Sequence, residues 1–142
     1  MPSGAEPDRV GGLRFVALAA GSLALQVTLG LHLRAVMAGE MAPWGHVGNL
    51  RRAHSHLGYY GILFPLAWWA WSRAGRPAPG PRTMACYAAA TLAGTLGFAD
   101  AGYSGVAIAA STAVLGVWLA SAWGQRSTLR GVLSRSHHSW WA

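Results

Sequence analysis

The chain has 142 residues, of which 53% are hydrophobic and only 11% are charged, and its formal net charge at pH 7 is +7. Few soluble domains of this length combine so many apolar residues with so few charges, so the composition predicts a single integral membrane domain. The arginines flank apolar stretches instead of forming one surface with aromatic residues, which favours anionic headgroups of the lipid bilayer as their partner and argues against nucleic acid.

Four apolar stretches follow in chain order, at about residues 13–37, 54–72, 82–100 and 102–123. Each is close to the ~20 residues that cross a hydrocarbon core of ~30 Å. We find no alternation of apolar and polar residues typical of a membrane barrel strand, and a helix satisfies its own backbone hydrogen bonds in lipid. The sequence therefore predicts an all-α, integral membrane fold, a four-helix transmembrane bundle. The second and third stretches have short uncharged cores, so each could instead be a re-entrant segment.

The distribution of arginine predicts the orientation of these helices. The chain contains no lysine, and most of its arginines lie on the side of the termini and of the loop after the second stretch. The other side holds Arg34, Arg51 and Arg52. The positive-inside tendency then places both termini, and the tail at 124–142, in the cytoplasm of a multi-pass protein in the inner (plasma) membrane. No cleavable signal pattern precedes the first stretch, so we expect that stretch to remain attached.

Histidines give the strongest indication of a functional site, because ionisable side chains in or beside a bilayer are costly and usually face the protein interior. The predicted topology places His32, His54 and His56 at a similar depth near the outer face. Asp100 ends the third stretch on the same side, and Glu40 lies in the outer loop. The chain has one cysteine, which excludes an intramolecular disulfide and a cluster of thiolate ligands.

His54 and His56 cannot both face one cofactor from a regular helix, because residues two apart point about 200° apart around its axis. Either they lie on an unwound first turn and hold one small ion together, or only one of them is a ligand. His56 shares its face with Tyr60 and Leu63. The face of His54 leaves a groove in which a flat macrocycle or a neighbouring helix can lie, along Gly58, Gly61 and Pro65.

Residues 48–54, Gly-Asn-Leu-Arg-Arg-Ala-His, lead into an apolar helix and resemble the start of the second transmembrane helix in the catalytic subunit of haem-copper oxidases, especially cbb-type oxidases and nitric oxide reductases. In that family an arginine-containing turn precedes a histidine that ligates the low-spin haem, so the resemblance implies His54 as an axial ligand. The pattern His-Ser-His-Leu-X-X-X-Gly at 54–61 also resembles small uncharacterised four-helix membrane proteins with a His-Thr-His signature. The third and fourth stretches contain no histidine, so the resemblance implies no oxygen or nitric oxide reduction.

Three functions are compatible with these residues. The first is a redox or sensing protein that holds a b-type haem through His54, with His32 as its partner. The second is a copper or zinc site built from His32, His54 and His56, in a metal-handling protein or in an enzyme where Asp100 or Glu40 carries protons. The third is an accessory structural subunit of a membrane complex or homo-oligomer. No phosphate-binding loop or nucleophile elbow is present, so the substrate, the reaction and the question of whether the protein is an enzyme stay open.

Overall fold

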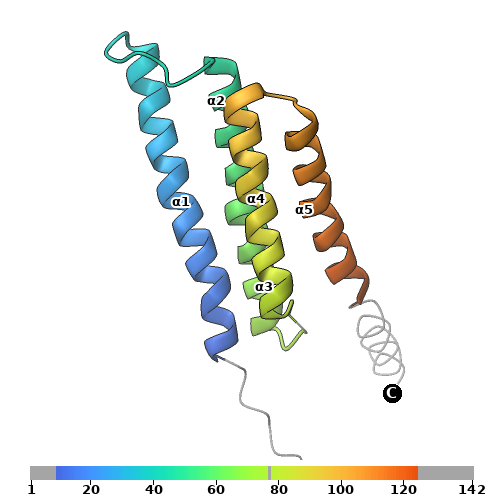
Figure 1. The fold of residues 1–142 in the computed structure, drawn as a ribbon. Helices are drawn as coiled ribbons and strands as arrows, with labels where there is room; N and C mark the ends of the chain where they lie inside the picture. The colour runs from blue at the N-terminus through green and yellow to red at the C-terminus, as the bar shows by residue number, and fades with distance from the viewer. Residues whose placement is uncertain (1–8, 77, 125–142) are drawn as a thin grey trace, which may run out of the picture.

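The computed structural model describes residues 9–76 and 78–124, and all regular structure within these ranges is helical. Its elements are α1 (Arg9–Met37), α2 (Val47–His56), η1 (Leu57–Leu63), α3 (Phe64–Arg73), α4 (Pro81–Ala101) and α5 (Gly105–Gly124). Helices α2, η1 and α3 follow one another without a break and form one long rod, so the described chain consists of four antiparallel helical rods (Figure 1). The predicted all-helical fold is confirmed.

Two of these helices are long and apolar enough to cross a membrane, namely Gly12–Met37 and Gly105–Gly124. The first three helical rods begin before the apolar stretches from which they were predicted, whereas α5 begins at Gly105, after the predicted start at residue 102. The rod begins at Val47 and not near residue 54, because its polar first turns still bury Leu50 and Ala53. The second and third stretches each lie in a continuous helical rod (Figure 1).

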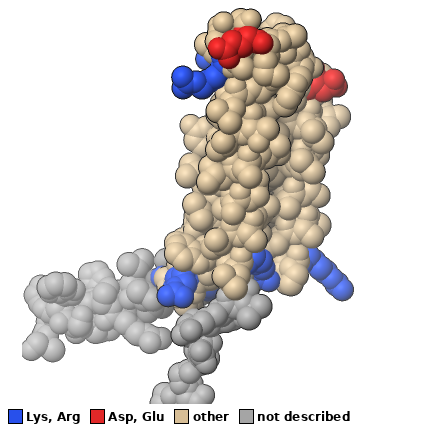
Figure 2. Space-filling model, turned by 90° about the vertical axis from the view of Figure 1, so that its left-hand side faces the viewer, with Lys and Arg blue, Asp and Glu red and all other residues tan. Residues whose placement is uncertain are grey.

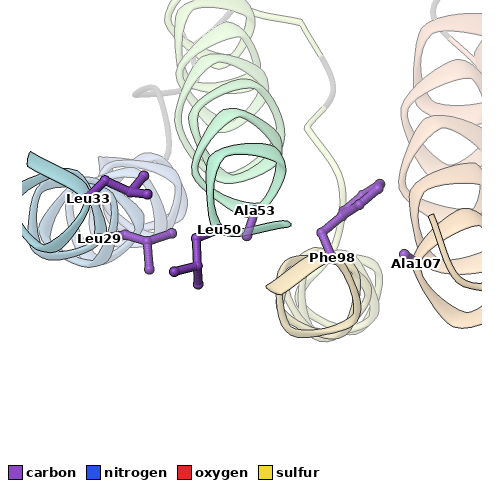
Figure 3. Close-up of a cluster of buried hydrophobic side chains, with 6 residues drawn as sticks. All are labelled: Leu29, Leu33, Leu50, Ala53, Phe98 and Ala107. Atoms are coloured by element: carbon purple, nitrogen blue, oxygen red, sulfur yellow. The ribbon is translucent and has the colours of Figure 1, made fainter. Parts of the chain in front are cut away.

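The rod α2–η1–α3 is the centre of the packing. Helix α1 lies along one side of it, α4 lies along the other, and α5 packs mainly on α4 (Figure 1). Near the end of the bundle where α2 begins, one buried cluster joins all four rods: Leu29, Leu33, Leu50, Ala53, Phe98 and Ala107 (Figure 3). Toward the other end, a second cluster contains Phe15, Trp68, Met84, Tyr87 and Val114.

The middle of the rod is a π-helix, and Pro65 leaves one of its backbone carbonyls without a backbone donor. In this segment the N–H of Phe64 bonds to the carbonyl of Tyr59, five residues earlier. The same spacing would pair the carbonyl of Tyr60 with residue 65, which is a proline and has no N–H. The hydroxyl of Tyr87 on α4 donates to that carbonyl instead, at 2.6 Å. A buried inter-helix hydrogen bond thus replaces the missing backbone bond.

Charged side chains of the described residues gather at the two ends of the rods. Figure 2 shows this on one face, where the middle of the molecule carries no Lys, Arg, Asp or Glu. At the end where α1 begins, Arg14 donates from Nη2 to the carbonyl of Pro79 at 2.8 Å, which ties α1 to the loop before α4. Arg51 and Arg52 lie at the opposite end, in α2.

Candidate functional site

His54 and His56 point to opposite sides of α2, as the helical spacing predicts. His54 faces α1, where its Nδ1 lies 3.1 Å from the carbonyl oxygen of Gln26 and therefore donates to it. The side-chain Nε2 of Gln26 lies 3.4 Å from the carbonyl of His54 in return. The ring edge lies on Gly30, since a Cβ built there would be 3.1 Å from Cε1 of His54. His54 therefore contributes to the contact between α1 and the rod.

The glycine groove beside His54 holds a neighbouring helix. The side chain of Gln26 lies directly against Gly58, and a Cβ on Gly61 would be 2.6 Å from Oγ of Ser22. Both contacting side chains belong to α1. Of the two occupants predicted for this groove, a neighbouring helix is therefore the one seen in the structure. The groove does not fit a macrocycle in this arrangement. A b-type haem on His54 stays a prediction, and its support is the Nδ1–H bond to a carbonyl, which is how ligating histidines are commonly oriented.

His32 contacts the 38–46 loop, which connects α1 to α2. Its buried ring stacks on the indole of Trp44 with centroids 3.7 Å apart. The backbone N–H of Trp44 donates to Nε2 of His32 at 3.2 Å. This nitrogen therefore accepts a hydrogen bond that closes the 38–46 loop over the end of α1, and it is not directed at His54 or His56.

The predicted copper or zinc ligands do not come together. Among the described residues, no group of three or more His, Cys, Asp and Glu side chains could hold a metal ion. Asp100 is exposed at the end of α4, where its carbonyl accepts a bond from Nδ2 of Asn49 at 3.2 Å. Glu40 is exposed in the 38–46 loop. The proposed sharing of one ion by His32, His54 and His56, with a carboxylate beside it, is a prediction that this geometry does not support.

A cavity of about 580 Å³ lies on the other side of α2, among the rod, α4 and α5. It belongs to the same end of the bundle as the 38–46 loop. Phe98 forms part of it and points from α4 toward the side on which α5 lies (Figure 3). We call this cavity the His56 pocket; its lining residues are Gly48, Arg51, Arg52, Ser55, His56, Tyr60, Phe98, Tyr103 and Ser111.

His56 forms the inner wall of the His56 pocket and is only 6% exposed. Its ring contacts those of Tyr60 and Phe98, with centroids 4.6 and 5.1 Å away. Its Nδ1 lies 3.4 Å from Oγ of Ser111, while that hydroxyl donates to the carbonyl of Ala107 at 2.8 Å. Nε2 is buried without a hydrogen-bond partner among the described residues. This nitrogen faces Gly94 of α4 and is not exposed to the pocket.

Side-chain size explains why the pocket opens at this level. Lower in the bundle, Trp118 of α5 fills the space against the rod, with its ring 4.8 Å from Phe64 and 5.0 Å from Trp71. At the level of His56, α4 and α5 present Gly94 and Ser111 instead. A Cβ on Gly94 would be 2.7 Å from Nε2 of His56, so glycine is required there for the imidazole to fit. Large aromatic residues therefore hold α5 away from the rod, and small ones leave the space.

The mouth of the pocket is cationic. Arg51 and Arg52 are exposed there. Nη1 of Arg52 donates to Oδ1 of Asn49 at 3.0 Å, and its guanidinium lies 4.9 Å from the ring centroid of Tyr103. No ion pair with a carboxylate occurs within residues 9–76 and 78–124 for either arginine. Two cations thus stand beside an aromatic wall without a neutralising partner from the described chain.

Sequence reasoning placed His56 near the site but did not identify the pocket. The helical spacing of His56 and Tyr60 is correct, and their rings touch. Ser111 and Phe98 were missed because nothing local distinguishes them from ordinary helix residues. The pair Arg51–Arg52 was interpreted as part of a family-like turn, and its clustering beside His56 was the available signal.

Comparison of the chain with protein-family models, with curated proteins and with solved structures finds no match. The resemblance to haem-copper oxidases, which covers the first two predicted stretches and is carried by the motif at residues 48–54, stays a prediction.

Proposed function

We propose that the protein is a four-span protein of the inner (plasma) membrane, with both termini in the cytoplasm, that binds a small molecule in the His56 pocket at its outer face. All four rods are uncharged between their ends in the described sequence. The shortest of the four rods, α5, has 20 residues and is about 30 Å long at 1.5 Å per residue, close to the thickness of a hydrocarbon core. More arginines lie at the end of the bundle where α1 begins than at the end that holds the His56 pocket, which supports a cytoplasmic location for the termini.

The observation that best supports this proposal is a pocket of ligand size with a buried imidazole in its wall. A volume of about 580 Å³ is in the range of pockets that hold small molecules. Such sites combine apolar and aromatic walls with a few convergent polar groups. Here Tyr60 and Phe98 supply aromatic walls, and His56 and Ser111 supply polar groups. The arginines at the mouth, which no carboxylate of the described chain neutralises, support binding over a purely structural role.

Occupation of the pocket can be tested with two adjacent residues of α5. Ser111 lines the pocket, whereas Thr112 is exposed, and both hydroxyls donate to the carbonyl four residues earlier, at 2.8 and 2.9 Å. Ser111→Phe should fill the pocket, and Thr112→Phe should add the same ring to the outer surface. Native mass spectrometry of protein extracted in mild detergent should detect a bound small molecule in the parent protein and in Thr112→Phe, but not in Ser111→Phe. Equal occupancy of all three proteins, or none in any of them, would reject the pocket as the site.

A haem protein is the second candidate. The one observation in its favour is the bond from Nδ1 of His54 to the carbonyl of Gln26, which would leave Nε2 for iron. A Soret band in the purified protein, lost in His54→Ala and kept in His56→Ala, would establish it. Ser111→Phe should leave that band unchanged, because Ser111 lies on the other side of α2.

A further inference from the structure

Resting on the proposed function, we infer that the ligand of the His56 pocket is an anionic amphiphile, a single apolar chain with a carboxylate or phosphate head. Arg51 and Arg52 bind the head at the mouth, and the rings of the pocket contact the chain. The contacts of the mouth, the walls and the dimensions each restrict the ligand.

The mouth selects a negative charge. Arg51 and Arg52 both line the pocket, and no carboxylate of the described chain pairs with them. Guanidinium groups bind carboxylate and phosphate oxygens through charge-assisted, often bidentate, hydrogen bonds. Arg52 is also fixed in place, since Asn49 accepts its Nη1–H and Tyr103 lies under its guanidinium. A held cation loses less freedom on binding an anion than a freely moving one does.

The aromatic rings of the walls favour an apolar body. Phe98, Tyr60 and Tyr103 supply aromatic surface. The ring centroid of Phe98 lies 5.5 Å from that of Tyr103 and 5.1 Å from that of His56. Besides the arginines, the polar side-chain groups of the lining are the imidazole of His56 and the hydroxyls of Ser55, Ser111, Tyr60 and Tyr103. A highly hydroxylated solute would leave hydrogen bonds unmade where it faces the aromatic rings, at a cost for each buried group.

Position and size favour a single chain from the bilayer. The pocket lies between the rod and α5, which is in contact with the rod mainly through side chains such as Trp118 and Ser111. Arginines at the membrane surface and an apolar wall below them match the order of head and chain in an amphiphile lying in the outer leaflet. A space of about 580 Å³ suits one chain, and a two-chain phospholipid would have to leave most of its body outside.

The class of ligand can be tested by equilibrium binding to the full-length protein in phosphatidylcholine nanodiscs at pH 8. The probes are dodecanoate, dodecyl phosphate, dodecanol and inorganic phosphate, and the variants are Arg51→Gln, Arg52→Gln and Arg34→Gln. Arg34 is the matched control, because it is an exposed arginine in the last turn of α1 at the same end of the bundle. We expect saturable binding of both anionic amphiphiles, with Kd raised about tenfold or more by each pocket substitution and unchanged by Arg34→Gln.

The alternatives give different results. Dodecanol binding as tightly as dodecanoate would overturn the role of the head, and inorganic phosphate binding as tightly as dodecyl phosphate would identify a free anion as the ligand. Equal effects of all three arginine substitutions would show general attraction to a positive surface and would overturn the assignment of the head to the mouth. If no probe binds while a molecule still co-purifies with the parent protein and not with Ser111→Phe, the inferred class is wrong and the pocket remains the site.

Discussion

The bond between Tyr87 and the π-helix gives a prediction whose size follows from the structure. Tyr87 is fully buried, and its hydroxyl donates at 2.6 Å to the Tyr60 carbonyl that Pro65 leaves without a backbone donor. Tyr87→Phe removes that donor and leaves a buried acceptor unpaired, which costs about 1–3 kcal/mol. Little new cavity forms, because only the hydroxyl is lost. The exposed Tyr59, also in η1, provides the control, and Tyr59→Phe should change stability by less than about 0.5 kcal/mol.

The measurement is unfolding in mixed micelles of mild detergent and dodecyl sulfate, followed by helical circular dichroism. A double-mutant cycle with Pro65→Ala tests the physical reason, because alanine supplies an N–H that the Tyr60 carbonyl can accept. In the Pro65→Ala background, Tyr87→Phe should cost less than in the parent protein, with a coupling of about 1 kcal/mol. Equal costs of Tyr87→Phe and Tyr59→Phe, or an unchanged cost in the Pro65→Ala background, would refute the reasoning.

Three further predictions concern packing, the outer loop and topology. Gly94→Ala places a Cβ 2.7 Å from Nε2 of His56 and should lower the free energy of unfolding by about 1–3 kcal/mol. A Cβ at Gly116 would have nothing within 4 Å, so Gly116→Ala should be neutral or stabilising. The same micelle assay checks both variants, and equal effects would contradict the fit of His56 against α4. His32→Phe keeps an aromatic ring beside Trp44 but removes the acceptor of the Trp44 backbone N–H, so hydrogen exchange at this amide should become faster. An unchanged rate would show that the bond does not hold the 38–46 loop. Reporters inserted in the 38–46 loop should be outside and those inserted in the 73–80 loop should be cytoplasmic; the reverse would place the His56 pocket on the inner face.

The rods were predictable because their ends carry strong local signals. Arginines, glycines and prolines cluster between apolar stretches, as in the loop from Arg73 to Pro81, where one helix ends and the next begins. Single residues of these types inside a stretch, such as Pro65 and Gly94, do not end a helix here. The polar first turns of α2 were missed, since hydropathy does not reveal a helix that continues outside its apolar part. Helix geometry also predicted that His54 and His56 point apart, a result that requires no knowledge of neighbouring rods.

The partners of each histidine were not predictable in the same way. A face of Gly58 and Gly61 fits a macrocycle and a helix equally well, and only the position of α1 decides between them. The His56 pocket depends on residues from distant helices, such as Ser111, and on Trp118 holding α5 away from the rod. Helix α5 is apolar on all sides, so its sequence does not indicate which face meets the pocket.

Photo-crosslinking in native membranes tests the proposed pocket most directly. The photoreactive residue p-benzoylphenylalanine would replace Ser55, an exposed residue of the pocket lining, and in a second protein Thr112, on the outer surface of α5. After irradiation, intact-mass analysis should show a small-molecule adduct on the Ser55 protein that is absent from the Thr112 protein and is lost when Ser111→Phe fills the pocket. The same mixture of bulk lipid adducts at both positions, unaffected by Ser111→Phe, would contradict the proposal that the His56 pocket is a binding site.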